Sequence, residues 1–435
     1  MRNAVAVVFA CMLLSCSQEP LSVSAEDYHL ALDQTTEIMI HDIFSPPVAS
    51  RIYAYPTIAA YEIMTQQDST YTSLSSQLNE FKGIPQATTG VNHKVAAWIA
   101  YTELSKKLVF SEHMMESFQE MYFQRWKKAN KREFEDSRNY ATEVVNTMLA
   151  WMKNDLYNQT RTMPKFTIDT DEPSRWQPTP PAYMDGIEPH WNKIRPFTLS
   201  AVDQFKPETH PEFSLDPNSD FYKELQEVYT ISKELEEEGD ESEGIKIAQF
   251  WDCNPYVSVQ RGHLMFATKK ITPGAHWMGI TKIAARTSES DYMKTAAAYA
   301  LTAISLADGF ISCWDEKYRS NLIRPETLIN QHIDDSWQPI LQTPPFPEYT
   351  SGHSVVSGAA STVLTTLFGD DFAFTDDTEV PYGLPIRSYT SFNQAAAEAA
   401  ISRMYGGIHY RSAVDLGLTQ GKSIGRWVTQ NVKIK

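Results

Sequence analysis

Three short stretches in the last third of the chain carry residues that could bind an oxyanion and move protons at it. Their functional side chains and amides belong to Lys317, Arg324, Ser351, Gly352, His353, Arg403 and His409. Lysine and arginine supply positive charge, and the serine hydroxyl and glycine amide supply hydrogen-bond donors. The two imidazoles can bond to the central atom or transfer protons. The combination predicts a pocket for a tetrahedral or trigonal oxyanion.

The overall charge of the protein makes this cluster of cations informative. The 435-residue chain has 38 Lys and Arg against 54 Asp and Glu, which gives a net charge of −16. Such an acidic protein is a poor partner for nucleic acid or for an anionic membrane surface. An anion can bind here only where a local cluster of cations overcomes the global negative field.

Two of the stretches have ordinary structural explanations when each is taken alone. Lys317 and Arg324 lie two helical turns apart and would share one face if a helix from residue 292 continues, with Pro325 ending it. Basic side chains at a helix end also compensate the helix dipole. Arg403 and His409 flank a pair of glycines that would bring two helix ends together, and a lone histidine there is often a packed or capping residue.

The stretch Ser351-Gly352-His353 is placed where a helix N-terminus can hold an anion. A proline-rich run precedes it, and an apolar helix predicted over 353–368 follows. Ser351 suits the N-cap position, and the amides after it point out of the helix at the positive end of its dipole. Gly352 would allow an anion to approach closely. The alternative is a capped helix with a surface histidine.

The elements that must position these residues are predicted to be helices. Helical periodicity marks residues 27–44, 48–66, 92–108, 112–129, 132–156, 221–238, 245–251, 276–289, 292–314, 353–368, 391–404 and 409–432. Strand signals are sparse. The predicted fold class is therefore all-α, a helical-bundle architecture of two packed helical halves.

A proline- and aromatic-rich segment over 159–218 lies between the two halves. Its prolines exclude long helices and its aromatic side chains exclude a solvated linker, so we expect an ordered connection laid over the helices. The predicted organisation is an N-terminal helical half over 26–215, which contains most of this connection, and a C-terminal bundle over 216–435. The oxyanion site belongs to the C-terminal bundle.

The N-terminus has the pattern of an exported bacterial lipoprotein. Arg2 precedes a short apolar run that ends in Leu13-Leu14-Ser15-Cys16, and this run is too short to span a bilayer. We expect a lipoprotein signal peptide over 1–15 and a tether over 16–25 that begins with a lipid-modified Cys16. The protein would then reside in the periplasm or at the outer membrane or cell surface. An ordinary cleaved signal with an incidental cysteine is the alternative.

Two cysteines, Cys253 and Cys313, would remain beyond the tether. An oxidising compartment would permit them to pair, but their sequence positions do not place them within bonding distance. We expect two buried free thiols. Neither cysteine lies in a CxxC or Cys/His spacing, so the sequence gives no indication of a zinc site.

The order and spacing of the three stretches resemble the superfamily shared by vanadium-dependent haloperoxidases and type 2 phosphatidic acid phosphatases. The matching motifs are Lys317-x6-Arg324-Pro325, Ser351-Gly352-His353 and Ser402-Arg403-x5-His409. The resemblance covers mainly residues 300–420. The segment 176–196 is also similar, more diffusely, to the aromatic and proline-rich middle of bacterial haloperoxidases.

The resemblance implies a vanadate cofactor and a role for each motif residue. His409 would bond to vanadium through a ring nitrogen and is the expected metal ligand. The residues expected to hold the vanadate oxygens are Lys317, Arg324, Ser351, Gly352 and Arg403. His353 would be the catalytic acid–base residue, and Lys317 would also act in catalysis. The C-terminal bundle would then be the vanadate-binding bundle.

Several neighbouring positions favour vanadate over phosphate at this site. Phosphatases of the superfamily usually carry Asp four residues after the last His, where this chain has Ala413, and Asp415 would face another side of the helix. Trp314 and Phe346 match positions near the halide in haloperoxidases. Together with Tyr256 they are most similar to bacterial vanadium iodoperoxidases, although aromatic side chains in a helical bundle are by default core residues.

The resemblance therefore implies an exported vanadium-dependent haloperoxidase. It would oxidise a halide, iodide above all and bromide as a second candidate, with hydrogen peroxide to hypohalous acid, which halogenates organic acceptors. Two alternatives stay open. An acid phosphatase of the same superfamily would use His409 as its nucleophile. A non-enzymatic exported lipoprotein would bind an oxyanion at a vestigial site, which would not need to keep His353.

Overall fold

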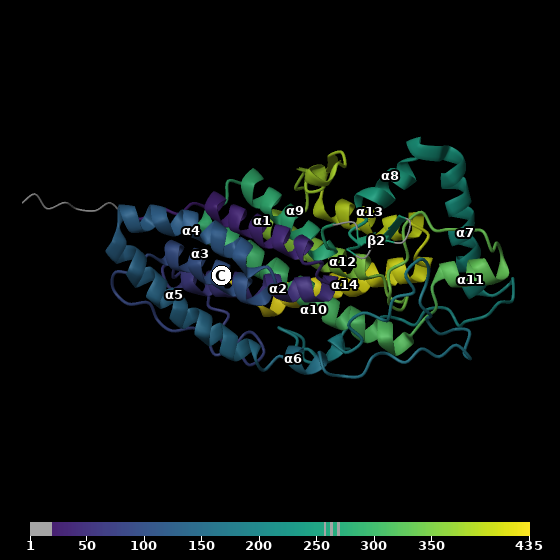
Figure 1. Ribbon diagram of the computed structural model, residues 1–435, viewed down its shortest axis with the longest axis horizontal. Helices are drawn as coiled ribbons and strands as arrows, with labels where there is room; N and C mark the ends of the chain where they lie inside the picture. Colours follow the sequence, from purple (N-terminus) through teal and green to yellow (C-terminus); the bar gives the residue numbers. More distant parts are fainter. Residues whose placement is uncertain (1–19, 256–257, 262–263, 268–269) are drawn as a thin grey trace, which may run out of the picture.

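The computed structural model describes residues 20–255, 258–261, 264–267 and 270–435 of an elongated helical protein (Figure 1). Its helices are α1 (Ala25–His41), α2 (Pro46–Thr65), α3 (His93–Leu108), α4 (Glu112–Ala129), α5 (Lys131–Met152), α6 (Tyr157–Thr160), α7 (Asp220–Glu238), α8 (Glu243–Phe250), α9 (Pro273–Thr287), α10 (Tyr292–Ser320), α11 (Pro325–His332), α12 (Gly352–Phe368), α13 (Phe392–Tyr405) and α14 (Arg411–Asn431). The predicted all-α fold class is confirmed. The predicted signal peptide, Cys16 and Tyr256 lie outside the described residues.

Two small hairpins and three single-turn helices complete the described structure. β1 (Ser258–Arg261) pairs antiparallel with β2 (Leu264–Ala267), and β3 (Phe374–Asp376) pairs antiparallel with β4 (Arg387–Tyr389). The 3-10 turns are η1 (Trp191–Lys193), η2 (Gly239–Glu241) and η3 (Val380–Tyr382). Because each sheet has two strands, neither forms a layer against which the helices pack.

Helix α10 runs through the centre of the molecule. It packs against α2 from the N-terminal half and against α12 and α14 from the C-terminal half. One cluster of buried apolar side chains contains residues of α1 to α5, α9, α10 and α12 to α14, so the core is continuous across both predicted halves. Among the described helices, α10 alone is long and apolar enough to cross a membrane, and its apolar window is wholly buried, as in a core helix.

The helix starts follow the capping residues that the sequence provides. Ser24 and Asp27 form a reciprocal capping box at α1, and the Ser351 hydroxyl accepts the Ser354 amide at α12. The sequence separates α1 from α2 at Ser45-Pro46-Pro47, but the structure starts α2 at Pro46, with Ser45 as its cap. Proline is favourable in the first turn because its missing N–H has no partner there.

The end of α10 does not place Lys317 and Arg324 on one helix face, which was one expectation from the sequence. The helix continues past residue 314 but stops at Ser320, and Asn321 follows in the left-handed conformation with φ 50°. Arg324 is instead the N-cap of α11, a short helix that the sequence did not predict. The two cations therefore do not lie on one face of one helix. The turn between the helices sets their relative position.

The proline- and aromatic-rich connection is ordered over the helices, as predicted. Trp176 and Trp191 within it are buried. Asp308 of α10 accepts the backbone amides of Phe197 and Thr198 at 2.6 and 2.8 Å, which ties the connection to the central helix. Since these hydrogen bonds satisfy a carboxylate that is itself fully buried, the connection is held by specific polar contacts as well as by aromatic packing.

Candidate functional site

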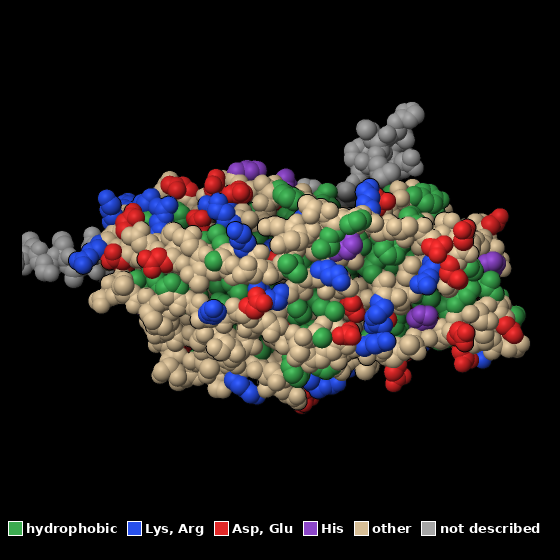
Figure 2. Space-filling view, turned by 90° about the horizontal axis from the view of Figure 1, so that it is seen from below, with side chains coloured by type: hydrophobic (Ala, Val, Ile, Leu, Met, Phe, Trp, Pro, Cys, Tyr) green, Lys and Arg blue, Asp and Glu red, His purple; other side chains and the backbone are tan. Residues whose placement is uncertain are grey.

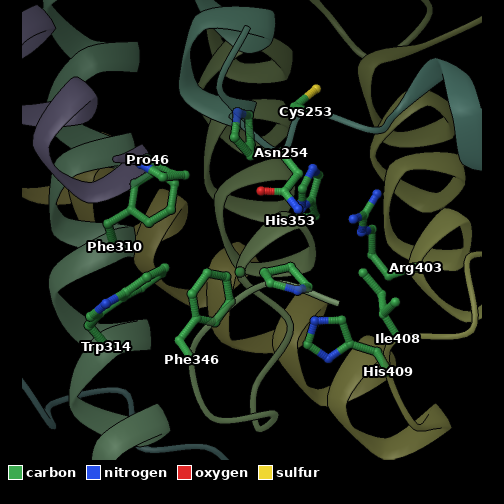
Figure 3. Close-up of a pocket in the computed structure, with 13 residues that line it drawn as sticks. Pro46, Cys253, Asn254, Phe310, Trp314, Phe346, His353, Arg403, Ile408 and His409 are labelled. Atoms are coloured by element: carbon green, nitrogen blue, oxygen red, sulfur yellow. The ribbon is translucent and has the colours of Figure 1, made fainter. Parts of the chain in front are cut away.

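Several of the predicted site residues line a small cavity at the C-terminal bundle, with a volume of about 30 Å³. Its lining residues are Pro46, Cys253, Asn254, Pro273, Phe310, Trp314, Pro344, Phe346, Gly352, His353, Arg403, Ile408 and His409. Figure 3 shows His353, Arg403 and His409 together on one side and the aromatic rings of Phe310, Trp314 and Phe346 on the other. The cavity thus has a polar, cationic wall that faces an aromatic wall.

Arg403 brings a buried guanidinium group to the polar wall, and Arg324 places a second one against His409. Arg324 donates to the carbonyl oxygens of Phe346 and Ile408, and Arg403 donates to the carbonyl oxygen of Trp251 at 2.8 Å. Nη2 of Arg324, and both Nε and Nη2 of Arg403, have no hydrogen-bond partner among the described residues. Buried donors without acceptors are costly, and an anion in the cavity would supply the acceptors.

His409 is held between Glu348 and Arg324, and these neighbours determine which of its ring nitrogens carries the proton. Nδ1 lies 2.7 Å from Glu348 Oε1, an oxygen that also accepts the Tyr410 amide at 3.0 Å. Nε2 lies 3.1 Å from Nη1 of Arg324, which can only donate. Nδ1 therefore carries the proton, and Nε2 is unprotonated, with the lone pair that a histidine ligand would use accepting a hydrogen bond from Arg324.

The electrostatics keep His409 neutral and the pocket positive. Burial, together with the charges of Arg324, Lys317 and Arg403, holds the pKa of His409 well below its ordinary value. Burial raises the pKa of Glu348 to about 8, against the opposing effect of Arg324 and Lys317. Burial lowers the pKa of Arg324 to about 10, and that group still stays cationic at neutral pH. A neutral imidazole among cations suits a ligand for an anionic centre.

Ser351, Gly352 and His353 form the N-terminus of α12, as predicted. Ser351 is fully buried and caps the helix, and Gly352 lines the cavity at its first turn. Nε2 of His353 is buried without a hydrogen-bond partner in the described structure. Burial and the charge of Arg403 hold the pKa of His353 well below its ordinary value, so the ring is a neutral base at the cavity wall.

Lys317 is placed differently from the two arginines. Its ammonium donates to the carbonyl oxygens of Pro347, Glu348 and Thr350 at 3.1, 3.0 and 2.5 Å, beneath the loop that leads into α12. Burial lowers the pKa of Lys317 to about 8, so the group is charged at neutral pH. All three of its N–H groups are engaged. In this arrangement Lys317 supports the loop directly and contributes its charge to the pocket at longer range.

The aromatic wall contains two of the three residues expected near a halide. Trp314 and Phe346 line the cavity with ring centroids 5.0 Å apart and an interplanar angle of 53°. The Phe346 ring also lies 5.0 Å from Lys317 Nζ and 5.1 Å from the Arg324 guanidinium carbon. Both rings are nearly buried, so they belong to the core and to the cavity at once. Tyr256 lies outside the described residues.

Glu348 is the functional residue that the sequence did not reveal. It lies next to Pro347 in the loop before α12 and reaches a histidine 61 positions away, a separation for which no spacing rule exists. This carboxyl group supplies the orienting contact that superfamily phosphatases obtain from the Asp expected where Ala413 stands. Ala413 instead contributes its carbonyl oxygen, which accepts the Ser351 amide at 3.0 Å. The absence of Asp at that position therefore no longer argues against a phosphatase.

The residues of the polar wall fit a vanadate ion. His409 offers an unprotonated imidazole nitrogen, which here accepts from Arg324, and other donors of Arg324 and Arg403 have no partner among the described residues. Gly352 lies close to the aromatic wall, because a Cβ added there would be in van der Waals contact with Trp314 at 3.6 Å. Such a cradle of cations, a helix N-terminus and one neutral nitrogen ligand suits a tetrahedral oxyanion whose central atom accepts a fifth ligand.

Comparison with known proteins shows which family the chain is similar to. Residues 297–434 match the family model described as the VCPO second helical-bundle domain. The crystal structure of the first bacterial vanadium-dependent iodoperoxidase matches with 60% sequence identity and a TM-score of 0.93, covering 96% of this chain and 99% of that chain.

More distant solved structures share the fold. Holo- and apo-type bacterial vanadium-dependent chloroperoxidases match at 16% identity with TM-scores of 0.66 and 0.64. They cover 90% and 89% of this chain, and 93% and 95% of their own. The search of curated proteins gave no match. With 60% identity to the iodoperoxidase over nearly its whole length, this chain belongs to the family of bacterial vanadium-dependent haloperoxidases.

Proposed function

We propose that this protein is a vanadium-dependent haloperoxidase that oxidises iodide with hydrogen peroxide to hypoiodous acid, which then halogenates organic acceptors. The observation that carries the proposal is the neutral, lone-pair-bearing Nε2 of His409, fixed by Glu348 beside unpartnered donors of Arg324 and Arg403. His409 would be the vanadium ligand, and Arg324, Arg403, Ser351 and Gly352 would hold the oxygens. Vanadate, when bound, supplies a Lewis acid that activates hydrogen peroxide without a change in oxidation state.

The residues of the chain have separable tasks in this reaction. His353, a neutral base with its Nε2 unpartnered among the described residues, would accept a proton from hydrogen peroxide. The cations at the polar wall would stabilise the negative charge that develops on oxygen as the peroxide bond breaks. Lys317 would add charge while it holds the loop that carries Glu348. The buried site would limit the access of water to these groups.

Iodide is the proposed halide for two reasons. The neighbour with 60% identity is by its description an iodoperoxidase. The cavity wall opposite the cations is formed by Phe310, Trp314 and Phe346, and an aromatic wall suits a large, polarisable and weakly hydrated anion. The positive edges of aromatic rings can contact such an anion, whereas a strongly hydrated halide would lose more solvation energy on entering.

One assay tests this function against the phosphatase alternative. Purified protein is incubated with orthovanadate, and triiodide formation from iodide and hydrogen peroxide is followed by absorbance. A vanadate-free sample is assayed with a phosphate ester. Iodide oxidation that depends on added vanadate is the expected result. Phosphate-ester hydrolysis without vanadate-dependent iodide oxidation would instead assign the site to a phosphatase, and neither activity would favour a binding protein.

The phosphatase alternative has one specific observation in its favour. Glu348 orients His409 as a nucleophilic histidine would need to be oriented, and phosphate has nearly the same shape and charge as vanadate. The same buried donors would hold either anion. The aromatic wall and the iodoperoxidase neighbour favour the haloperoxidase.

We further propose that the protein is an exported lipoprotein anchored through Cys16. The support is the sequence pattern of an N-terminal charge, a short apolar run and the Leu13-Leu14-Ser15-Cys16 ending. Mass spectrometry of the mature N-terminus after expression in a bacterial host that processes lipoproteins would test this location. A diacylated cysteine at position 16 is expected, and an unmodified N-terminus beyond it would contradict the anchor.

A further inference from the structure

A second cluster of ligand atoms adjoins the cavity through Cys253 and does not include His409. It contains Cys253 from the chain after α8, His276 from α9 and Glu379 from the turn at η3, all buried. His276 Nδ1 lies 3.4 Å from Cys253 Sγ and 3.4 Å from Glu379 Oε1, and Cys253 Sγ lies 3.8 Å from that oxygen. His276 and Glu379 lie 23 and 126 positions after Cys253 in the sequence, so no short sequence motif predicts the cluster.

The spacing of the three donors fits a tetrahedral zinc ion. Zinc binds sulfur at about 2.3 Å and nitrogen or oxygen at about 2.0 to 2.1 Å, which places neighbouring donors about 3.3 to 3.6 Å apart. The distances from His276 Nδ1 to Cys253 Sγ and to Glu379 Oε1 fall within this range. The distance from Cys253 Sγ to Glu379 Oε1 exceeds it by a few tenths of an ångström. Three protein donors around zinc leave one position for a water molecule.

The surroundings of His276 support a ligand role. Its second nitrogen, Nε2, lies 2.8 Å from Oδ2 of Asp376, a fully buried residue whose other carboxylate oxygen, Oδ1, accepts from Thr378. A histidine ligand commonly donates its other N–H to such a carboxylate, which orients the ring and fixes the tautomer. The indole of Trp251 stacks on the ring at 4.3 Å. Nδ1 is thereby aimed at Cys253 and Glu379.

We propose that Cys253, His276 and Glu379 bind a divalent transition metal, for which Zn²⁺ is the best-fitting ion. The site would join the end of α8, the helix α9 and the turn at η3. Cys253 also lines the haloperoxidase cavity, and the Trp251 carbonyl two positions earlier holds Arg403. The metal would brace this wall of the cavity, and it would convert a thiol that faces an oxidising site into a coordinated thiolate.

Zinc titration and metal analysis of the whole protein test this site. Wild type, Cys253→Ser and Glu379→Gln are stripped with a chelator, equilibrated with Zn²⁺ against a chromophoric competitor, and analysed for zinc and vanadium. Wild type should hold about one zinc per chain, and each variant should bind zinc at least tenfold more weakly. Replacement of zinc by Co²⁺ should produce a thiolate-to-metal absorption band that Cys253→Ser lacks.

The second buried cysteine provides the matched control. Cys313 lies on α10 with its sulfur against Thr350, and Cys313→Ser should keep zinc and the cobalt band. Wild-type protein that holds no more zinc than Cys253→Ser would overturn the proposal, as would a Cys253→Ser variant that keeps the wild-type affinity. Thermal unfolding of each variant verifies folding. Vanadate uses other donors, so vanadate binding in a zinc-free sample would leave the haloperoxidase assignment intact.

Discussion

At the scale of residues, the site depends on how buried groups set one another's protonation. His409 is neutral because it is desolvated among cations, and its proton lies on Nδ1 because Glu348 accepts there while Arg324 donates to Nε2. Lys317, Arg324 and Arg403 are all buried. Among the described residues they donate to backbone carbonyl oxygens and, in the case of Arg324, to His409, and an oxyanion would give their charges a direct partner.

Replacing Glu348 tests the orientation of His409. Glu348→Gln keeps the shape but can present its amide NH₂ to Nδ1, which would favour the wrong tautomer. We expect vanadate affinity to fall by roughly 10- to 100-fold, as for other groups that orient a metal ligand. Isothermal titration with orthovanadate measures it. Glu62→Gln, at a buried glutamate of α2 that accepts from Leu74 and Ser73, is the matched control and should bind as wild type does. Equal affinities in all three proteins would remove Glu348 from the site.

The lowered pKa of Lys317 predicts a pH dependence of vanadate binding. The free protein holds the Lys317 proton below about pH 8 and loses it above, so the pocket loses one positive charge as the pH rises. Vanadate affinity should be constant between pH 6.5 and 7.5, and should fall by up to about tenfold per pH unit above 8. Lys317→Met should bind more weakly at every pH and lack this step. Because the ionisation of vanadate is common to both proteins, the ratio of their affinities isolates Lys317. A ratio that does not change with pH would contradict the prediction.

The motif residues could be predicted at this scale, but their partners could not. Lys317, Arg324, Arg403 and His409 were identifiable because their types and spacing match a known pattern. Glu348 acts through a contact with a residue 61 positions away. Lys317 donates its hydrogen bonds to backbone carbonyl oxygens of a loop, and no sequence pattern predicts such contacts. Ala413 leaves the position without a carboxylate, and the carboxyl group that contacts His409 comes from Glu348, which the sequence did not mark.

At the scale of elements, helix ends place the groups and close helix packing holds them. The N-terminus of α12 brings Ser351 and Gly352 to the cavity, the N-cap of α11 brings Arg324, and the C-terminus of α13 brings Arg403. Helices α12 and α14 make the most extensive contact of any pair described, and glycines at 358, 417, 421 and 425 face the partner backbone there. The small residues allow the two helix axes to approach closely.

Gly421 tests this close approach. A Cβ at this position would lie 1.9 Å from the Val355 carbonyl oxygen, so the helices must separate in Gly421→Ala. We expect the variant to lose roughly 3 kcal/mol of unfolding free energy, and to lose vanadate affinity because α12 moves. Gly274→Ala is the control, because its nearest neighbour would be at 3.8 Å and alanine favours a helix. Denaturant unfolding measures the stability of both variants. Equal stability of the two would show that the contact between α12 and α14 is not tight.

Helix existence was predictable from periodicity and capping, but helix ends were less so. The boundaries of α3 and α4 agree with those predicted within one residue. By contrast, α10 extends six residues beyond the predicted end at 314, and α14 starts at Arg411 and not at His409. Tertiary contacts decide such ends, as when Glu348 accepts the Tyr410 amide just before α14.

At the scale of the whole molecule, the N-terminal helices and the connection form the scaffold for the C-terminal site. The apolar core runs continuously through both halves, and α10 belongs to the core on one side and carries Trp314 and Lys317 to the site on the other. Surface charge of both signs is distributed over the face shown in Figure 2, whereas the cations of the site are buried. The division at residue 215 remains a prediction about how the chain is organised.

Asp308 tests the attachment of the connection to this scaffold. Asp308→Ala would leave the amides of Phe197 and Thr198 buried without acceptors. We expect a loss of roughly 3 kcal/mol of unfolding free energy and faster proteolysis within 159–218. Asp171→Ala, at an exposed aspartate of the same connection, should leave both properties unchanged. Unaltered unfolding of Asp308→Ala in urea would show that aromatic packing alone holds the connection.

The central claim is that His409 binds vanadate and that the bound vanadate oxidises iodide. The most direct measurement compares wild type with His409→Ala for two quantities in the same samples, vanadium content after equilibration with orthovanadate and the rate of triiodide formation with hydrogen peroxide. We predict about one vanadium per wild-type chain with rapid triiodide formation, and at least a hundredfold loss of rate with little retained vanadium in His409→Ala. Wild-type rates of iodide oxidation in the His409→Ala protein would contradict the claim.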